Sequence, residues 1–539
     1  MTSKVSGKKH KQKPKEVSYQ KAYIISAAII AAISLLIRYF AFDSPIMRDE
    51  AVYSLLGNKV MQGKIPFVDF FEMKPPLLYY CYGLGGLIFS WSSFGLRMLG
   101  LFLTIVNTGL LILIAKKFSS WSFSLLVGSV GLFLAQNIFN FYTETNSELF
   151  IVTFLLSGIY FLFRKTSKWN FLYLFLAGFF IAGTALIKQT YALLGIGAVL
   201  LIVIEHYRKD GFYQGDGIIK NVGSLALGAV SIITLCLIPI LLTGSLEDAI
   251  YWTFTYPSTY SSKISWGEGR EYLRIFGGWV FKYQLFTNSL LLLSGIATLI
   301  LYKAKFYWFI LIPFFLALAL IFPGLRFYGH YWIPVYAIMP LFLIGLKTVL
   351  EKYKIKQTSI IISLSCLLMV AGDIGRNGDK YFERDYAKNT ALARSNNLQS
   401  IMFQMLNELK KEIQPHHTFG VFGIDANAYF FMEKKPVFDQ IYPVMIAMDN
   451  EKNRVYQGEA IEEYKNANVD YAFYALTGES WKSSNVSNDF LYNQTFYYLR
   501  NNYEPLVVFN YDEKKFYNVK AGDSFDWFKP NQVMTLKRK

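Results

Sequence analysis

Cysteine is scarce in this chain of 539 residues, and the three that occur, Cys81, Cys236 and Cys366, all lie in apolar stretches. Such positions indicate neither a disulfide framework nor a thiolate metal site, and we expect these side chains to be small core residues. Charged residues are also few, at 17%. Nothing in the sequence resembles a P-loop, an HExxH site or a GxSxG site, so ATP-driven, metalloprotease and serine-hydrolase functions have no support.

Hydrophobic residues, in contrast, make up 53% of the chain and aromatic residues 18%. This composition is too apolar for one soluble domain and predicts a polytopic α-helical membrane protein. The net charge of +16 could suggest nucleic-acid binding, but the lysines fall in short clusters at the ends of apolar segments. These lysine clusters indicate how the helices are oriented in the membrane. No nucleic-acid partner is expected.

The N-terminal segment, residues 1–20, is lysine-rich, has no apolar face and is followed by no small-residue cleavage site. We expect it to be a disordered cytoplasmic tail before a first span near 21–40. Two apolar blocks follow, at 75–91 and 94–115. If both crossed the membrane, every later basic cluster would lie outside, whereas all of them lie inside if only the second crosses. The block at 75–91 is short and rich in proline and glycine, so we expect it to lie at the outer interface.

This reasoning predicts about eleven spans, with the N-terminus inside and the C-terminus outside. The remaining spans are expected near 122–141, 149–163, 170–187, 190–205, 222–243, 284–302, 306–322, 331–349 and 358–372. The membrane domain then covers 21–372 with a first outer loop at 42–93. The basic clusters expected on the inner side are Lys116-Lys117, Arg164-Lys165-Lys168, Arg208-Lys209, Lys303-Lys305 and the run 347–356.

From about Asp373 the composition becomes that of a soluble domain. Helical patterns at 390–413, near Asn427, at 459–466 and at 491–501 alternate with strand-like runs at 417–424 and 469–476, and a hairpin is expected at 505–519. This pattern predicts an extracytoplasmic α/β domain over 373–539. It lacks a glycine fingerprint for a dinucleotide, and no catalytic role is assigned to it.

The segment 48–80 concentrates charge beside the first span. Carboxylates and a lysine between two apolar blocks are costly to desolvate unless something binds there, so this segment is a candidate site. The alternative is an amphipathic surface helix with ordinary solvated charges. The residues concerned are Asp49, Glu50, Asp69, Glu72 and Lys74.

The order of these residues resembles the first extracytoplasmic loop of GT-C glycosyltransferases. The matching elements are Asp49-Glu50, Asp69, Glu72 and the run Lys74-Pro75-Pro76-Leu77. The likeness is greatest to the protein mannosyltransferase and aminoarabinose transferase relatives, which take a sugar from a polyprenyl-phosphate carrier. The resemblance implies a GT-C fold, a bacterial inner-membrane location and transfer of a sugar on the extracytoplasmic side.

Sugar transfer from a lipid phosphate needs a base for the incoming hydroxyl, an oxocarbenium-like transition state and positive charge near the departing phosphate. Asp49, paired with Glu50, is the candidate base. Its alternative role is that of a carboxylate stabilising the N-terminus of the helix that follows.

Four further carboxylates are candidates for positioning the acceptor or a metal: Asp69, Glu72, Glu144 and Glu148. Glu144 and Glu148 lie four residues apart and would share one helix face. With Asp49 they could hold a divalent cation, and oxygen ligands beside a phosphate would suit Mg²⁺ or Mn²⁺. Relatives carry an acidic residue in this second loop, and which of the two corresponds to it stays open.

Cations for the donor phosphate are available in Lys74, Lys188, Arg326 and His330. The segment from Arg326 to Trp332 resembles the Arg or His-Tyr element that contacts the lipid-linked donor in these transferases. An interfacial aromatic belt is the alternative for His330, and a snorkelling helix-end lysine is the alternative for Lys188. Arg97 is expected to support the site from behind. The polyprenyl tail needs a groove, which the segments 178–197 and 306–345 could line.

The main rival function is a transporter or flippase of a lipid-linked glycan, which would place ionisable groups near the bilayer midplane in paired repeats. Here they are expected at one surface, which favours an enzyme. A ligase using a pyrophosphate-linked glycan is a third possibility. The expected partners are a polyprenyl-phosphate sugar, membrane lipid, and a glycan, lipid or protein acceptor, while the sugar and the acceptor themselves stay open.

Overall fold

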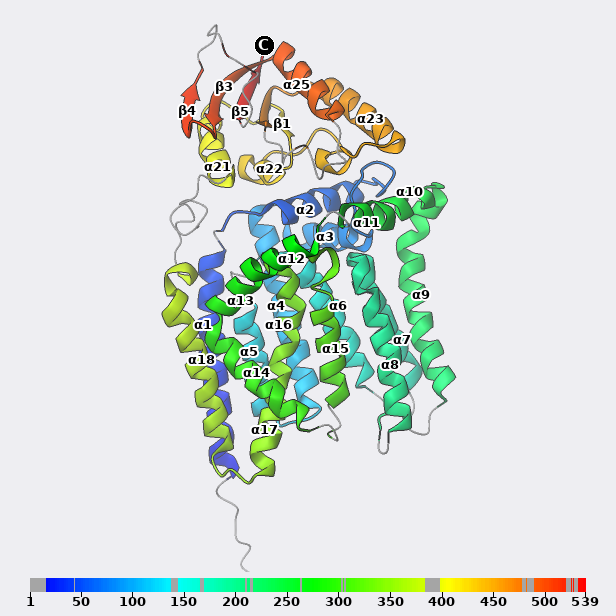
Figure 1. Cartoon of the computed structure of the whole chain (residues 1–539), viewed down its shortest axis with the longest axis vertical. Coiled ribbons are helices and arrows are strands. Elements are labelled where there is room, and N and C mark those ends of the chain that lie inside the picture. The colour runs from blue at the N-terminus through cyan, green and yellow to red at the C-terminus, as the bar shows by residue number, and fades with distance from the viewer. Residues whose placement is uncertain are drawn as a thin grey trace, which may run out of the picture.

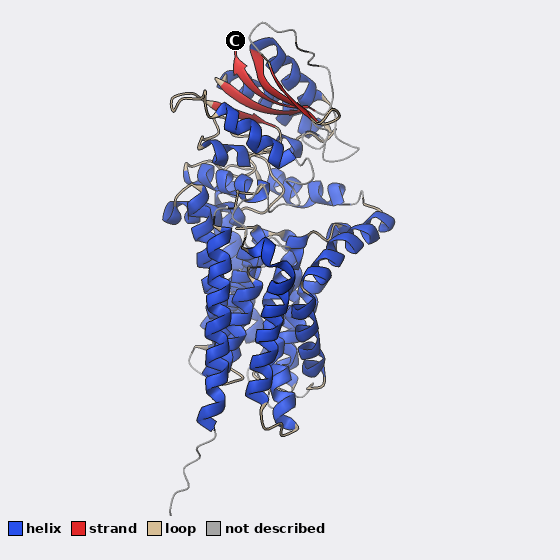
Figure 2. Ribbon diagram, turned by 90° about the vertical axis from the view of Figure 1, so that its left-hand side faces the viewer, coloured by secondary structure: helices blue, strands red, loops and turns tan. Residues whose placement is uncertain are grey.

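The computed structural model describes residues 16–42, 44–136, 144–164, 169–208, 211–213, 217–261, 264–301, 304, 307–382, 398–476, 481, 489–519, 525, 527 and 532–539. Most of the expected tail (1–15), part of the expected helix at 390–413, and Lys165, Lys168, Lys209, Lys303 and Lys305 of the basic clusters lie outside these residues. A bundle of long helices carries a smaller α/β domain on one end (Figures 1 and 2). The helix α1 begins at the opposite end of the bundle (Figure 1).

Within the described residues, seven helices are long and apolar enough to cross a membrane, and five apolar helices are shorter. A helix stands at each of the eleven expected segments. These helices are α1 (Glu16–Ala41), α4 (Ser93–Lys116), α5 (Trp121–Leu134), α6 (Ser147–Leu162), α7 (Asn170–Ile187), α8 (Leu193–Tyr207), α9 (Ile218–Leu242), α14 (Leu285–Leu299), α15 (Tyr307–Ala319), α16 (Ile333–Ile338) continuing into α17 (Phe342–Lys352), and α18 (Thr358–Tyr381).

Large apolar side chains on α9, such as Leu227, Val230, Leu235 and Leu242, are more than half exposed. A helix of this length with an exposed apolar face is typical of a segment surrounded by lipid. The expected fold class, a multi-pass α-helical membrane protein with a C-terminal α/β domain, is confirmed.

Short helices lie across the end of the bundle that carries the α/β domain (Figure 1). They include α2 (Arg48–Met61) and α3 (Leu77–Phe89), followed later by α10 (Leu246–Ile250), η3 (Tyr251–Thr255), α11 (Tyr256–Ser261), α12 (Trp266–Tyr272), η4 (Leu273–Gly277) and α13 (Gly278–Tyr283). The segment 245–283, which joins α9 to α14, is thus largely helical. The 13 residues of α3 extend about 20 Å, which is short of a hydrocarbon core of about 30 Å.

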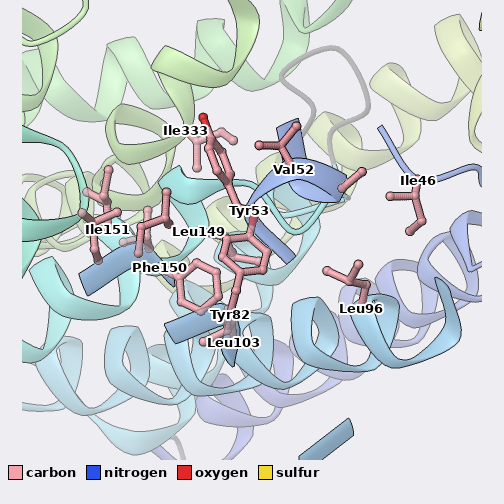
Figure 3. Packing of buried hydrophobic residues seen from close by; sticks show 14 of the residues in the cluster. Ile46, Val52, Tyr53, Tyr82, Leu96, Leu103, Leu149, Phe150, Ile151 and Ile333 are labelled. Carbon is pink, nitrogen blue, oxygen red and sulfur yellow. The ribbon is translucent and has the colours of Figure 1, made fainter. Parts of the chain in front are cut away.

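Apolar packing holds α2 against the bundle. Tyr53 of α2 packs against Tyr82 of α3, with ring centroids 5.9 Å apart, and Tyr82 packs against Phe150 of α6 at 5.0 Å. These side chains form a buried layer with Leu149 and Leu103 beneath α2 (Figure 3). This part of the first outer loop therefore packs on a closely packed apolar layer.

The C-terminal domain is a five-stranded sheet in the order β1-β2-β5-β3-β4, flanked by helices. β1 and β2 are parallel and the other neighbours are antiparallel. The elements are α21 (Leu398–Leu409), β1 (Phe419–Phe422), α22 (Asn427–Met432), η8 (Pro443–Met445), α23 (Glu451–Ala467), β2 (Tyr471–Leu476), α25 (Phe490–Asn502), β3 (Tyr503–Asn510), β4 (Lys515–Asn518) and β5 (Gln532–Arg538).

The boundary expected at 373 lies inside α18. Asp373 is buried, and its carboxylate accepts hydrogen bonds from the backbone amides of Phe286 and Thr287 at the start of α14, each at 3.3 Å. The polar residue that suggested a change of domain therefore caps a neighbouring helix of the bundle.

Candidate active site

The first turn of α2 carries the Asp49-Glu50 pair, and the two carboxylates have different surroundings. Glu50 is fully buried and forms a two-pronged ion pair with Arg97 of α4, at 2.8 and 2.9 Å. It also accepts hydrogen bonds from the backbone amides of Met47 and Thr145, both at 2.8 Å. Glu50 therefore fastens the first turn of α2 to the bundle instead of facing outward.

Asp49, in contrast, is exposed, and no hydrogen-bond or ion-pair partner for its carboxylate is found in the described part of the chain. Its charge still reaches into the site. Burial first and the Asp49 carboxylate second raise the pKa of Tyr53, one turn along α2. Asp49 is thus a carboxylate open to solvent beside a buried layer.

The second acidic segment meets the first at Thr145. Next to that residue, the half-buried Glu144 carboxylate accepts a hydrogen bond from the side chain of Asn146 at 3.0 Å. Burial and the nearby Glu50 carboxylate raise the pKa of Glu144 well above its usual value, against the opposing effect of Arg97. The Glu144 carboxyl therefore tends to keep its proton, which it could donate to a hydroxyl or a phosphate oxygen.

Glu148 and Lys188 form a buried pair at the outer ends of α6 and α7. The lysine Nζ lies 2.9 Å from Glu148 Oε1, and Ser147 Oγ donates to Oε2 at 2.9 Å. The same ammonium lies 3.7 Å from the centre of the Tyr331 ring. Lys188 thus joins the second acidic segment to the late aromatic segment, and its charge is already balanced.

Lys74 lies in the loop before α3 and is half-buried. Within the residues described, its ammonium has no hydrogen-bond or ion-pair partner. The backbone around it is fixed by the buried Glu72, which accepts hydrogen bonds from the Lys74 amide at 2.8 Å and from the Tyr79 hydroxyl at 2.7 Å. Burial raises the pKa of Glu72 and the charge of Lys74 opposes this. Burial raises the pKa of Glu148, but Lys188 and, to a smaller extent, His330 and Lys74 lower it below its usual value.

Arg326 and His330 enter from the loop between α15 and α16, through the 3-10 helices η5 (Pro323–Leu325) and η6 (Gly329–Trp332). Arg326 donates to the Tyr328 hydroxyl at 3.1 Å, and the Tyr328 ring stacks on His330 with centroids 5.7 Å apart. Burial lowers the pKa of His330, and the Glu148 carboxylate opposes this. Since the Tyr331 ring next to His330 contacts the Lys188 ammonium, the late segment lies against the Glu148–Lys188 pair.

Asp69 has a different surrounding from the other candidates. Its carboxylate accepts from the Ile65 amide at 2.7 Å and lies 3.4 Å from the ammonium of Lys64, so it closes the turn at 65–69. This arrangement is that of a loop-stabilising residue.

An apolar cavity of about 490 Å³ opens beside Lys74. Pro75 and Pro76, the two residues after this lysine, line it together with residues of α7, η2 (Gln189–Ala192), α8 and α9. Of the described residues, the lining set includes part of 178–197 but none of 306–345. The packing of α7 on α9 shapes the cavity, and a Cβ atom at Gly178 would lie 1.8 Å from the Leu225 carbonyl oxygen.

The residues expected to hold a divalent cation do not fit that role. Both oxygens of Glu148 have partners, and Glu144 is held in the form that binds metals poorly. Across the ranges described above, no group of three His, Cys, Asp or Glu side chains could hold a metal ion.

Three residues of the site had no clear sign in the sequence. Tyr53 and Thr145 look like ordinary helix and loop residues. Tyr53 packs on Tyr82 of α3, and the Thr145 amide donates to Glu50, so both contacts depend on the fold. Arg48 begins the charged segment, but its partner is Asp425 in the C-terminal domain, at 3.0 Å. A charge without a nearby partner, directly before the Asp-Glu pair, was the one available signal.

Comparison with known proteins gives one family match. The family model described as dolichyl-phosphate-mannose-protein mannosyltransferase matches residues 73–238. No curated protein matches the chain.

Solved structures with a similar fold cover nearly the whole chain. The crystal structure of ArnT from Cupriavidus metallidurans bound to undecaprenyl phosphate has a TM-score of 0.51 and 10% sequence identity, and the match covers 94% of this chain and 97% of that chain. ArnT in the apo state has a TM-score of 0.49 and 12% identity over the same shares. The Archaeoglobus fulgidus oligosaccharyltransferase with a tethered acceptor peptide has a TM-score of 0.44 and 12% identity, covering 96% of this chain and 76% of that chain.

Proposed function

We propose that this chain is a membrane glycosyltransferase of the GT-C superfamily that transfers a sugar from a polyprenyl-phosphate donor to an acceptor hydroxyl, with Asp49 as the general base. The family match over residues 73–238 and the fold shared with ArnT support this proposal. Two observations carry this proposal: the exposed Asp49 carboxylate has no partner among the described residues, and Lys74, likewise without a partner among them, directly precedes two prolines that line an apolar cavity.

The chemistry requires a proton acceptor on one side of the sugar and positive charge on the other. The acceptor oxygen forms a bond to the anomeric carbon while the bond from that carbon to the phosphate oxygen breaks. The hydroxyl proton passes to Asp49, and the polyprenyl phosphate leaves with the electron pair. Because Asp49 is exposed and carries no cation partner among the described residues, it can approach an incoming hydroxyl.

Lys74 is the proposed main contact of the donor phosphate. Pro75 and Pro76 line the cavity, so an isoprenoid chain lying there would hold its phosphate next to the Lys74 ammonium. A charge-assisted contact is among the stronger hydrogen bonds available to a phosphate. Arg326, whose charge acts on Tyr331 together with that of Lys74, would share the charge that develops on the departing phosphate. Burial lowers the pKa of His330, so this ring would donate an N–H to the phosphate as a neutral group.

The other carboxylates have supporting roles in this proposal. Glu50, paired with Arg97, would hold Asp49 in position, and Glu148 would do the same for Lys188. Glu144 would donate its proton in a hydrogen bond to the acceptor or the phosphate. Glu72 and Asp69 would fix the loop around Lys74.

We also propose that this site lies on the extracytoplasmic side of a bacterial plasma membrane. The C-terminal domain and the site share one end of the bundle, and α17, which ends at Lys352, descends to the other (Figure 1). Basic residues at that other end, including Lys116, Lys117 and Arg208, favour it as the cytoplasmic side.

Purified enzyme incubated with a panel of polyprenyl-phosphate sugars tests the proposal. One donor should be consumed by the wild type, and Asp49→Asn should abolish its transfer while the protein remains folded in detergent. Glu271→Gln, which removes an exposed carboxylate from α12, is the matched control and should keep full activity. Wild-type turnover by Asp49→Asn would exclude Asp49 as the base.

A further inference from the structure

Two ion-pair contacts join α2 to the C-terminal domain, one at each end of the helix. At the start of α2, Arg48 lies 3.0 Å from Asp425. At its far end, Lys59 lies 2.6 Å and Lys64 2.7 Å from the two oxygens of Asp439. The C-terminal domain, more than 350 residues away in the chain, thus binds both ends of the helix that carries Asp49.

The contact at the start of α2 is the more buried of the two. The Asp425 side chain is completely buried, whereas Asp439 keeps 25% of its side chain exposed. Asp425 follows β1, near the carboxyl end of a parallel strand pair, where an α/β domain commonly presents its polar groups. Its second oxygen, Oδ2, has no hydrogen-bond partner within the described residues, so Arg48 is the group that compensates its charge.

Arg48 also interacts with the carboxylate that follows it in the chain. Burial lowers the pKa of the Arg48 guanidinium, but Asp425 first, Tyr442 next and then Asp49 raise it, with a net increase. The guanidinium therefore has two possible partners. In the folded protein it is bonded to Asp425, and the Asp49 carboxylate stays open to solvent.

We propose that Asp425 is a positioning residue for transfer: by holding Arg48, it keeps that guanidinium off Asp49 and sets the direction of the first turn of α2. The inference rests on the proposed role of Asp49. It gives the C-terminal domain a part in the reaction, because Asp425 of that domain binds Arg48 and so keeps Arg48 from pairing with the proposed base, Asp49. Without Asp425, Arg48 would turn to Asp49 and occupy the oxygens that should receive the acceptor's proton.

Transfer kinetics of Asp425→Asn and Asp439→Asn test this inference, with the donor found by the panel above. Both variants lose one interdomain contact of α2. We expect Asp425→Asn to lower kcat at least tenfold with donor KM within twofold, and Asp439→Asn to keep both values within twofold. The double variant Arg48→Gln/Asp425→Asn should recover most of the lost kcat, because the competing guanidinium is gone.

A second measurement needs no substrate. In hydrogen–deuterium exchange, Asp425→Asn should speed exchange at the start of α2, and Asp439→Asn should do so only near Met61. A variant Asp425→Asn with wild-type kcat would overturn the inference, and so would equal losses of kcat in both single variants, since these would mean a general loss of docking. Full activity of Asp49→Asn would instead overturn the proposed function, so the two failures can be told apart.

Discussion

The ion pair between Glu50 and Arg97 gives the sharpest stability prediction. Both side chains are almost completely buried, and Glu50 accepts four hydrogen bonds, two from the guanidinium and two from backbone amides. Arg97 also donates to the carbonyl oxygens of Ser44 and Pro45, at 3.2 and 2.7 Å. Arg97→Leu would leave the Glu50 carboxylate buried without its counter-charge.

Removing one partner of a buried pair costs about 3–5 kcal/mol. Glu50→Leu should cost a similar amount, because it leaves the Arg97 guanidinium unpaired. The double variant Glu50→Leu/Arg97→Leu buries no charge, but it leaves the backbone amides of Met47 and Thr145 without a hydrogen-bond acceptor. Each unsatisfied amide lowers the free energy of unfolding by about 1–3 kcal/mol. The double variant should therefore be less destabilised than the sum of the single variants, with a coupling energy of roughly 2 kcal/mol or more.

Unfolding of the purified protein in mixed micelles, titrated with SDS and followed by near-ultraviolet circular dichroism, measures these differences. The exposed pair of Glu271 in α12 and Arg274 in η4 is the control, and Arg274→Leu should cause no resolvable change. Single variants of the buried pair within about 1 kcal/mol of wild type, or a double variant equal to their sum, would refute the reasoning.

Three further predictions test the donor contact, the acidic segment and the helix packing. Lys74→Gln should raise the donor KM at least tenfold, because a charge-assisted phosphate contact is lost, and an unchanged KM in initial-rate measurements would contradict this. Folding raises the pKa of Glu144, so its ionisation destabilises the fold increasingly as pH rises above the unfolded value. Glu144→Gln should consequently exceed the wild type in Tm at pH 8 and match it at pH 4, and a difference that is constant with pH would be evidence against it. Gly228→Ala should lower Tm, because its Cβ would lie 1.8 Å from the Phe175 carbonyl oxygen, whereas Gly223→Ala on the same helix meets nothing within 4 Å and should not.

The positions of the membrane helices could be predicted from the sequence because lipid favours long, continuous runs of apolar residues. Their lengths could not, since several of these helices, such as α5 and α15, are shorter than the expected spans. The strands at 417–424 and 469–476 followed from local alternation and are present as β1 and β2. β5 (Gln532–Arg538) could not be predicted this way. It is a short run with a basic end, and it becomes a strand because it pairs on both sides, with β2 and β3.

Candidate site residues could be found from charge, but their partners could not. Glu50 and Asp49 look alike in the sequence, and they differ only because Arg97, 47 residues later, meets one of them. The sequence also predicts Lys188 as a phosphate ligand and does not indicate that the Glu148 carboxylate pairs with its ammonium. Such long-range pairing depends on the fold and therefore cannot be predicted from local sequence patterns.

The central place of β5 in the sheet has a consequence for how the protein is made. The ribosome completes β5 after the other four strands of the sheet and long after α2. Until this sheet has closed, Arg48 and Lys59 lack their partners Asp425 and Asp439. A nascent chain therefore cannot complete the contacts between α2 and the C-terminal domain before that domain has folded, so this docking comes late in biogenesis.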